Sequence, residues 1–561
     1  MTFARRRANV ASVPRSINRR EILIVGGATV FGMTGFRTAA AQQPGQPPTA
    51  DSLKAWADKA AALMPELVET AQLPVSLVRA VAAPDAALRF RMETEAPASA
   101  LASRALRKGD SVIVDFEGHR TGYLSFRLAT EGREPDAPVR LRFTFGEVPT
   151  DVAEPFYPYK GQLSEAWLPD EVINVDYLPQ AVRMPRRYAF RYVKIEVLDT
   201  SPEFRIRFED LKAHAVTSAR TMPAPLDKET PLMRRIDAVS VATLRDCMQT
   251  TFEDGPRRDR RLWIGDLRLQ ALTNYYTFRQ NDVVKRCLYL FASLPRPDGL
   301  AAACVFEKPA ARYGGLHIVD YAALFNVALF DYVEATGDLE TGRDLWPAAR
   351  RQLEIIGRDI DSEGRYIDPG NMWIFIDWLD QLDKNAAIQG LLIYAYRQTL
   401  ALARRIGRDA DVADFERRIE RMVAAARKHY WDASKRVFVS GPKRQVSWAS
   451  QAWMNIAGVS SKREGADAMR TAMADAQAIR PVTPYLYHYV VEGLLAGGLK
   501  KEARALLESY WGGMIAAGAD TFWEIYDPAQ PLRSPYGDIH INSYCHAWSC
   551  TPSYLLRSGR C

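Results

Sequence analysis

"VTSARTMPAPLDKET", residues 216–230, divides the 561-residue chain into two regions with different hydrophobic patterns. Before this stretch, short segments alternate apolar and polar residues, as in "SVIVDFEG" at 111–118 and "VRLRFTFGEV" at 139–148. After it, apolar residues recur at helical spacing and strand patterns almost vanish. A period of two indicates strands and a period of 3.6 indicates helices. We therefore expect two domains with different secondary structure.

The region before this linker is expected to form an antiparallel β-sandwich over residues 80–216. Its strands are short and alternate in polarity, and Gly, Pro and Asp separate them, which is typical of a sandwich. Residues 42–79 are expected to hold a proline-rich linker, which begins "QQPGQPPTA", and a short helix near 51–72.

The region after the linker, residues 229–561, is expected to be an all-α (α/α)6 toroid that forms the catalytic domain. About twelve amphipathic segments follow one another without a sequence repeat, which argues against a regular solenoid. They lie near 229–248, 264–279, 282–294, 318–335, 338–360, 384–406, 409–431, 446–458, 462–476, 483–496, 499–516 and 543–557. Six helical hairpins can close into a ring around a central pocket. The long aromatic loops 296–317, 361–383 and 518–542 are expected to frame it, because long loops in compact domains are usually functional.

The first 41 residues are expected to be an export signal of the twin-arginine type. Arg19 and Arg20 precede a modest apolar run, and Ala39–Ala41 supply small residues before a cleavage point at Gln42. This predicts a periplasmic or secreted protein of a Gram-negative-type bacterium, with no stable membrane insertion after cleavage. An uncleaved membrane anchor is the alternative. The segment holds seven arginines and one glutamate, so its removal lowers the net charge of +7 by six, to +1. A nearly neutral chain gives no indication of nucleic-acid binding.

The six cysteines form no C-x-x-C pair, and no His/Cys cluster has the spacing of a zinc site. We therefore expect no metal site, and we expect no organic cofactor either. Twin-arginine cargo folds in a reducing cytoplasm, so buried thiols are expected, with a Cys545–Cys550 bridge as the alternative. The sequence favours no particular oligomeric state.

One charged stretch, "TFEDGPRRDRRLWIGD" at residues 251–266, carries the first candidate site. Asp254, Asp259 and Asp266 lie at offsets 0, 5 and 12, with Trp263 among them. The neighbouring arginines can hold the carboxylates by bidentate pairing. A salt-bridge network that only locks the entry of a helix is the structural alternative.

Carboxylates beside tryptophan recur in the later loops, which favours a saccharide site. These candidates are Asp320, then Trp373, Asp377 and Trp378, then Trp523 and Glu524, and finally His546 near Trp548. Tryptophan faces stack on sugar rings, and carboxylates bind hydroxyls or transfer protons. Glycoside cleavage needs two carboxyl groups on opposite sides of the bond, and loops far apart in the sequence, such as those of Asp259 and Glu524, can supply them.

These motifs resemble, in order and approximate spacing, those of the bacterial α-L-rhamnosidases of glycoside hydrolase family 78. The segments are "EDGPRRDRRLWIGD", "IVDYAALF", "FIDWLDQ", "TFWEIYD" and "SYCHAWS", and the strand region adds "LRFTFGEV" and "YAFRYVKIEV". The resemblance covers residues 85–557. It implies an (α/α)6 catalytic domain and hydrolysis, with inversion, of terminal α-linked L-rhamnose.

The resemblance also implies roles for individual residues. Many members carry Asp-x-x-x-Arg-Asp-Glu-Arg-x-Gly-Trp-x-Gly-Asp with the glutamate as general acid, whereas this chain is one residue shorter there and has Arg260 in place of that glutamate. Matching the shorter form makes Asp259 the general acid, and the "TFWE" motif makes Glu524 the general base. The substrate-binding positions are Asp254, Asp266, Trp263, Asp320, Trp373, Asp377, Trp378, Trp523 and His546. Arginines next to Asp259 would lower its pKa, so burial or Asp254 must offset them.

Two other functions remain open at the level of sequence. A polysaccharide lyase, or a hydrolase for another sugar, could use the same fold, with Tyr526, His546 and the arginines of residues 257–261 acting on a uronate. A carbohydrate-binding protein that has lost catalysis is suggested by Arg260.

Overall fold

The computed structural model of the protein describes residues 47–561. The expected export signal, residues 1–41, lies outside the described residues. Within the described part, no helix combines the length and apolar character that a membrane crossing requires.

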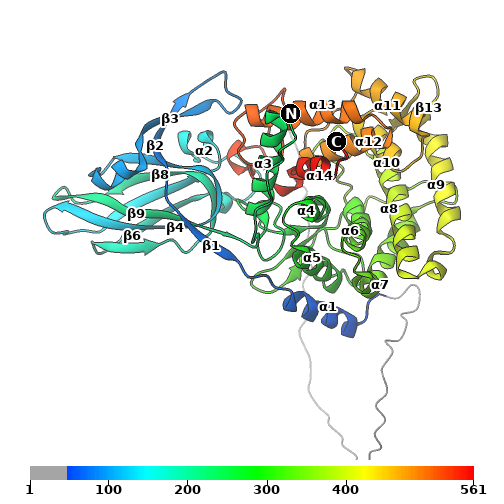
Figure 1. Ribbon diagram of the computed structural model, residues 1–561, viewed down its shortest axis with the longest axis horizontal. Coiled ribbons are helices and arrows are strands. Elements are labelled where there is room, and N and C mark those ends of the chain that lie inside the picture. Colours follow the sequence, from blue (N-terminus) through cyan, green and yellow to red (C-terminus); the bar gives the residue numbers. More distant parts are fainter. Residues whose placement is uncertain (1–46) are drawn as a thin grey trace, which may run out of the picture. The chain divides into compact units, whose positions relative to one another are not determined.

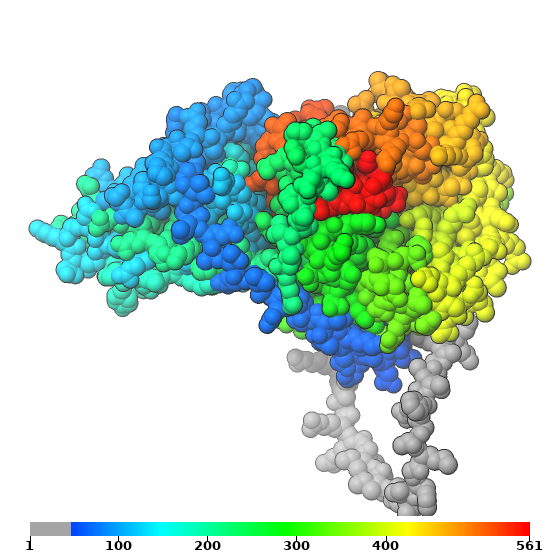
Figure 2. Space-filling view, viewed as in Figure 1, coloured from blue at the N-terminus to red at the C-terminus, as the bar shows by residue number. Residues whose placement is uncertain are grey.

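Helix α1 (Ala50–Ala62) precedes the strands in sequence but packs on the helical domain. The Lys59 ammonium lies 2.5 Å from the Asp344 carboxylate, and α1 contacts α5 (Asn281–Ser293). In Figure 2 the blue residues of α1 lie against the green residues of the helices. The helix ends ten residues before the expected position 72, because Pro65 disfavours helical geometry at the residue before it.

The β domain contains nine antiparallel strands and begins at Val68, twelve residues before the expected boundary. The strands are β1 (Val68–Gln72), β2 (Ser76–Ala82), β3 (Phe90–Pro97), β4 (Ser111–Gly132), β5 (Val139–Gly146), β6 (Asp170–Val175), β7 (Gln180–Arg183), β8 (Tyr188–Asp199) and β9 (Phe204–Thr217). The path of paired strands is β1-β9-β4-β8-β5-β6, with β2, β3 and β7 attached beside it (Figure 1). A short helix, α2 (Pro149–Ala153), follows β5.

Strand β4 covers two segments that the alternation pattern presents as separate strands. Its pairing with β8 is interrupted between Asp115 and Arg120, and Glu117 in that interval has φ +66°. Beyond the bulge, β4 pairs with β9 and β7. Phe126 of this second half stacks on Phe143 of β5 at 5.2 Å, although β4 and β5 are not paired strands. The sheet therefore folds over one apolar core, as expected for a sandwich.

The helical domain contains twelve helices after the linker, as the amphipathic segments predicted. They are α3 (Pro231–Cys247), α4 (Ile264–Tyr276), α5, α6 (Val319–Thr336), α7 (Leu339–Ile356), α8 (Asn385–Ile406), α9 (Phe415–Tyr430), α10 (Trp448–Ile456), α11 (Lys462–Ala474), α12 (Pro484–Ala496), α13 (Lys500–Ala516) and α14 (Thr551–Arg557). The loops between these helices contain two small sheets of short strands. The strands are β10 (Leu262–Trp263), β11 (Cys304–Phe306) and β12 (Arg312–Tyr313) in one sheet, and β13 (Trp431–Asp432), β14 (Val437–Ser440) and β15 (Gln445–Val446) in the other.

Alternate helices form an inner ring, visible in Figure 1. The contacts run from α4 to α6, α8, α10 and α12, and α14 returns to α4. Helices α4, α10 and α12 are buried on nearly all sides, whereas α7 and α9 have one buried face. A helix that is apolar all round belongs in the interior, and an amphipathic one belongs outside. This is the six-hairpin arrangement that the sequence predicted.

The last helix begins eight residues later than expected. Residues 543–550 are irregular apart from a 3-10 turn at Ala547–Ser549, and α14 begins at Thr551. Pro552 explains the boundary, because its ring would clash with the carbonyl of Trp548 in a continuous helix. The irregular backbone carries His546 and Trp548 to the cavity described next.

Candidate active site

A cavity of about 230 Å³ lies where the inner-ring loops meet the β domain. Its lining comes from residues 254–266, 316–321, 373–378 and 524–548 of the helical domain and from 163–167 of the β domain. We call its buried end, formed by Asp254, Asp266, Glu524 and His546, the floor. We call its exposed end, formed by Leu163, Ser164, Trp167, Leu316, Trp373 and Trp378, the mouth.

The floor joins two aspartates to a histidine. The Asp254 carboxylate accepts a hydrogen bond from the Arg261 backbone N–H at 3.1 Å, and Asp266 Oδ1 lies 3.1 Å from His546 Nε2. His546 Nδ1 is buried and has no hydrogen-bond partner among the described residues. Burial opposes the charged ring of His546, but Asp266 and Glu524 raise its pKa above 6.5. The floor therefore offers carboxyl oxygens to a polar ligand, beside the His546 ring.

Gly265 allows the inner helices to meet behind this floor. A Cβ atom at this position would lie 2.3 Å from the Tyr321 ring, which itself lines the cavity. The structure places this glycine inside α4, where close packing requires it.

Glu524 is held by hydrogen-bond donors only. Arg258 Nη2 lies 2.9 Å from both carboxylate oxygens, the Tyr536 hydroxyl donates a short hydrogen bond, and the Ser543 backbone N–H donates at 3.3 Å. The side chains of Arg258 and Glu524 are only 4% and 2% exposed. These contacts fix the orientation of the Glu524 carboxylate at the cavity.

Asp259 lies on the other side of the Arg258 guanidinium. Its carboxylate is 3.6 Å from Arg258 Nε and 3.7 Å from Arg261 Nη1, and its side chain is 17% exposed. These are ion pairs without hydrogen bonds. A single arginine thus contacts both predicted catalytic carboxylates, although they lie 265 positions apart in the chain.

The neighbouring Asp254 holds its proton more tightly than an ordinary aspartate. Burial, followed by the charge of Asp259, raises the pKa of Asp254 well above its usual range. Two carboxyl groups so placed retain one proton at a pH at which isolated aspartates have lost theirs. The raised pKa belongs to Asp254, and the role of Asp259 as general acid stays a prediction.

Arg260 turns away from the cavity. Its backbone has a positive φ of +54°, and its guanidinium donates to the carbonyl oxygens of Pro256 at 2.9 Å and Arg187 at 2.6 Å. Burial, with the nearby Arg187, lowers its pKa to about 10. The residue in place of the family glutamate therefore binds backbone carbonyls and does not occupy the site.

Three of the four predicted tryptophans line the cavity. The indole N–H groups of Trp263 and Trp378 are buried and have no hydrogen-bond partner among the described residues, and Trp373 lies 5.4 Å from Trp378. The prediction for Trp523 is wrong. This residue is 2% exposed and packs edge-on against Tyr526 and Tyr544, so it contributes to the core beneath the site.

The predicted substrate contacts of Asp320 and Asp377 are also corrected, because both side chains bind protein groups behind the residues that line the cavity. The Asp320 carboxylate accepts from the backbone N–H groups of Phe375 and Ile376, both at 3.0 Å. The Asp377 carboxylate accepts from the Val482 backbone N–H at 3.0 Å and the Thr483 hydroxyl at 2.6 Å, and burial raises its pKa to about 6.

The two aspartates hold a strained turn that carries the cavity tryptophans. Ile376 has φ +52°, a conformation that is strained for a β-branched residue. Such strain persists where the surroundings fix it, often at a functional site. Asp320 and Asp377 therefore position Trp373 and Trp378 without lining the cavity themselves.

Several lining residues had not been selected from the sequence. Tyr536 lies in a loop expected to be functional, and its ring stacks under the Arg258 guanidinium at 4.3 Å. Aromatic content in a long loop was the available signal. Leu163, Ser164 and Trp167 belong to the β domain, and no pattern in the sequence indicated that they reach the site.

The β domain also anchors the catalytic loops through buried charges. Arg257 forms two hydrogen bonds with Asp151 of α2, at 2.6 and 2.9 Å, and donates to the His540 carbonyl at 2.7 Å. Glu147 accepts from the Tyr544 backbone N–H at 2.8 Å. These contacts tie the loops of residues 254–266 and 539–548 to one frame.

Three side chains of types that bind metal ions lie close together at this contact between the domains. Atoms of His119, Asp246 and Cys545 lie within 4.8 Å of one another. However, His119 Nδ1 is 2.6 Å from Asp246 and Nε2 is 2.9 Å from Glu147, so neither ring nitrogen is free for a metal ion. The cluster fits a carboxylate–imidazole–carboxylate link between the domains.

All six cysteines are free thiols, and five of them are buried. This agrees with the prediction of buried thiols. The alternative Cys545–Cys550 bridge is not formed, and Cys545 Sγ instead lies 3.9 Å from Cys247 Sγ.

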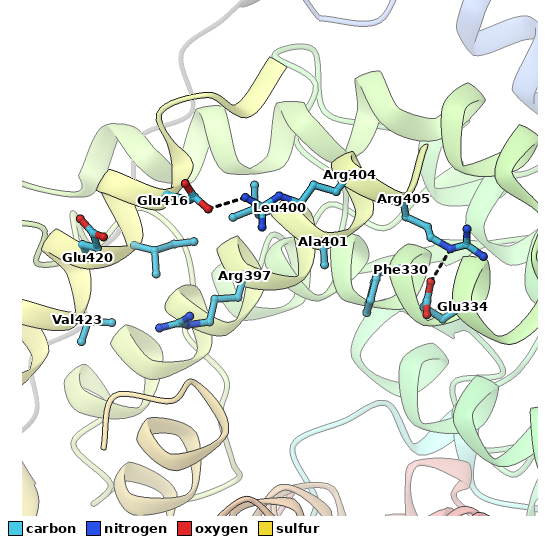
Figure 3. Close-up of a pocket in the computed structure, with 11 residues that line it drawn as sticks. Phe330, Glu334, Arg397, Leu400, Ala401, Arg404, Arg405, Glu416, Glu420 and Val423 are labelled. Atoms are coloured by element: carbon cyan, nitrogen blue, oxygen red, sulfur yellow. Dashed lines mark hydrogen bonds and ion pairs between the residues drawn. The ribbon is translucent and has the colours of Figure 1, made fainter. Parts of the chain in front are cut away.

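A larger hollow of about 870 Å³ lies on the outside of the helical domain, between α6, α8 and α9. Figure 3 shows the exposed ion pairs Arg404–Glu416 and Arg405–Glu334 across it. Its lining contains no tryptophan and no buried carboxylate. The smaller cavity is therefore the better candidate for chemistry.

Comparisons with known proteins agree with this geometry. A model of the glycosyl hydrolase family 78 alpha-rhamnosidase N-terminal domain matches residues 74–215, and one of the bacterial alpha-L-rhamnosidase six-hairpin glycosidase domain matches residues 226–558. A rhamnosidase structure from Klebsiella oxytoca with rhamnose bound is 44% identical, with a TM-score of 0.88 over 90% of this chain and 98% of that chain.

More distant structures share the fold. A family 78 rhamnosidase of a Bacillus species is 23% identical, with a TM-score of 0.69 over 84% of this chain and 49% of that one. An α-L-rhamnosidase of Streptomyces avermitilis complexed with L-rhamnose is 15% identical, with a TM-score of 0.64 over 88% and 44%. A comparison with curated protein sequences finds no match.

Proposed function

Because this chain belongs to the bacterial α-L-rhamnosidases of glycoside hydrolase family 78, a family of glycosidases, we propose that it releases terminal α-L-rhamnose with inversion at the anomeric carbon. The observation that carries the proposal is the Arg258 guanidinium, which touches Asp259 and Glu524 at one cavity. Inverting glycosidases need an acid and a base on opposite sides of the bond, about 6.5–9.5 Å apart.

In the proposed reaction, Asp259 donates its proton to the leaving oxygen while the glycosidic C–O bond breaks. Glu524 takes a proton from water, whose oxygen bonds to the anomeric carbon from the opposite face. Asp259 is partly exposed at the cavity, so its carboxyl group can reach the leaving oxygen of a bound sugar. Arg258, Tyr536 and Ser543 hold the Glu524 carboxylate in place by hydrogen bonds.

The size of the cavity supports cleavage at chain ends. Ligand pockets usually measure about 300–1,000 Å³, and this one measures about 230 Å³. One sugar ring suits this volume better than several. In the proposed complex, Asp254, Asp266 and His546 bind the hydroxyls of that ring, and Trp263 packs on its apolar side.

Glu524→Gln tests the base. We expect kcat on an aryl α-L-rhamnoside to fall by about 10²–10⁴, the usual contribution of a general base. Glu492→Gln is the matched control, since Glu492 is also buried beside arginine, 3.2 Å from Arg560, but lies outside the cavity. Unchanged turnover by the Glu524 variant would remove this residue from the mechanism.

A panel of aryl glycosides tests the choice of sugar and the two other functions. The expected result is release of aglycone from the α-L-rhamnoside and no unsaturated product. A lyase would produce ultraviolet absorbance from a uronate polymer. A non-catalytic protein would bind sugar without product. The structure does not favour a lyase, because Arg257 and Arg260 bind protein groups and are not free to bind a uronate. It does not favour a non-catalytic protein either, because the Arg260 side chain does not occupy the cavity.

We also propose that residues 1–41 direct export by the twin-arginine route to the periplasm or beyond. The supporting feature is the Arg19–Arg20 pair before a weakly apolar run. Replacing both with lysine should retain the enzyme in the cytoplasm. Export of this variant, or a mature chain that does not begin near Gln42, would contradict the proposal.

A further inference from the structure

The two ends of the cavity differ in chemistry. The floor residues are each no more than 4% exposed and are all ionisable. The mouth combines three tryptophans and two leucines with one serine hydroxyl. Asp259 touches the leaving oxygen in the proposed reaction, and it is the more exposed of the two catalytic acids. Since the floor is closed, the leaving group must extend through the mouth.

One side of the mouth is supplied by the β domain. Residues 156–168, which we call the wall segment, lie between α2 and β6 and carry Leu163, Ser164 and Trp167. The Gln162 backbone N–H donates to the Tyr536 carbonyl at 2.7 Å, and the Lys160 N–H donates to Asp538 at 3.3 Å. The segment is thus fixed to the loop that also holds Glu524.

Apolar packing fixes Trp167 in the same place. Phe156 and Leu168 of the wall segment form a buried cluster with Ile541, and Leu163 and Trp167 pack against it. Trp167 remains partly exposed and lines the cavity. Its side chain is therefore supported from behind and free to contact a ligand at the mouth, which is the usual condition of a preorganised contact.

The arginines near the mouth are engaged by other groups of the protein. Arg261 lies over the Phe306 ring at 4.2 Å and pairs with Asp259 at 3.7 Å. Arg312 lies over the same ring at 4.1 Å. No lining residue on the wall segment is charged. Tryptophan faces can stack on sugars as well as on aromatic rings, but Ser164 is the one polar side chain of the mouth as defined, so few groups there can bind sugar hydroxyls. This surface therefore favours a flat apolar leaving group over an acidic or heavily hydroxylated one.

We propose that the wall segment forms the leaving-group side of the active site and that the enzyme prefers rhamnosides of flat, aromatic alcohols to rhamnose linked to another sugar. This inference rests on the proposed function of the cavity and names its substrate class. Trp167 is then a specificity-determining residue, whose contact is with the leaving group and not with the rhamnose ring.

Trp167→Ala tests the inference with two substrates, 4-methylumbelliferyl α-L-rhamnoside and methyl α-L-rhamnoside. We expect the ratio of kcat/KM for the aryl over the methyl substrate to fall about tenfold, mostly through KM, as befits one aromatic contact. Trp167→Phe should recover most of the ratio. Tyr177→Ala, which removes a 79% exposed tyrosine of the same domain, is the control.

The inhibition constant of free L-rhamnose reports on binding at the floor. In the Trp167→Ala variant it should stay unchanged while the KM of the aryl substrate rises. An unchanged ratio in the Ala variant, or an equal loss on both substrates, overturns the inference. So does a wild-type enzyme that cleaves a rhamnosyl disaccharide more efficiently than the aryl substrate. Wild-type protein that cleaves no α-L-rhamnoside refutes the proposed function itself, a result distinct from an unchanged ratio.

Discussion

Asp259→Asn is the substitution that best separates an acid catalyst from a binding residue. The variant keeps the shape of the side chain and removes its proton-donating role. General acid catalysis contributes about 10²–10⁴-fold, or about 2.7–5.4 kcal/mol of barrier at 1.36 kcal/mol per tenfold. The full reduction in rate is expected for methyl α-L-rhamnoside, because its leaving alkoxide must be protonated. It should be small for 2,4-dinitrophenyl α-L-rhamnoside, whose leaving group departs without a proton.

The structure predicts that stability will change little in this variant. Within the described part of the chain, the carboxylate of Asp259 has two contacts with cations, at 3.6 and 3.7 Å, and neither is a hydrogen bond. Arg258 keeps Glu524 as a partner, and Arg261 keeps the Phe306 ring. Because no hydrogen bond is lost and both arginines keep other partners, we expect the free energy of unfolding to change by only about 1 kcal/mol. A thermal scan therefore distinguishes lost chemistry from lost folding.

Asp254→Asn supplies the comparison, because Asp254 shares the proton of the pair but lies at the floor. It should slow both substrates by a similar factor, as expected for a residue that binds sugar hydroxyls. The assay is kcat/KM for each leaving group in the wild type and both variants. If the leaving-group dependence follows Asp254→Asn and not Asp259→Asn, the general acid is Asp254 and the assignment is refuted.

Two further predictions concern the buried charges outside the cavity. Asp151→Asn breaks the bidentate pair with Arg257, whose side chain is 2% exposed, so the free energy of unfolding should fall by about 3–5 kcal/mol and activity should fall with it. The control is Glu209→Gln in the exposed pair with Arg127, which should cost about 0–1 kcal/mol. Equal shifts of the thermal midpoint in the two variants would contradict the argument. Burial lowers the pKa of His488 from 6.5 to about 3, so as the pH falls below 6.5 the unfolded chain takes up a proton that the folded one refuses. Stability is then lost by about 2 kcal/mol between pH 6.5 and 5, and His488→Leu should flatten this part of the thermal-midpoint profile; a profile as steep as that of the wild type would show that His488 is not responsible.

Local pattern was sufficient to predict the two domains and most helices. Helix α8 spans Asn385–Ile406, against 384–406 from the sequence, because its apolar spacing continues without interruption. The errors occur where one residue overrides the pattern. Pro65 ends the first helix early, and Pro552 delays the last one.

The site was predicted less completely, because a carboxylate in a sequence does not reveal its partner. Asp320 and Asp254 are both acids near aromatic residues, and both accept from backbone amides. Of the two, Asp254 lines the cavity and Asp320 does not. The contribution of the β domain depends on the distant pairs Arg257–Asp151 and Tyr544–Glu147. Neither leaves a periodic signal in the chain, so only the folded structure reveals Trp167 at the mouth.

The most direct test of the central claim is the configuration of the first sugar released from an aryl α-L-rhamnoside, followed by proton NMR before the anomers equilibrate. An acid at Asp259 and a water-activating base at Glu524 predict that β-L-rhamnose forms first and then converts to the α anomer. Initial release of α-L-rhamnose would mean that the configuration is retained, and it would contradict the roles given to both carboxylates.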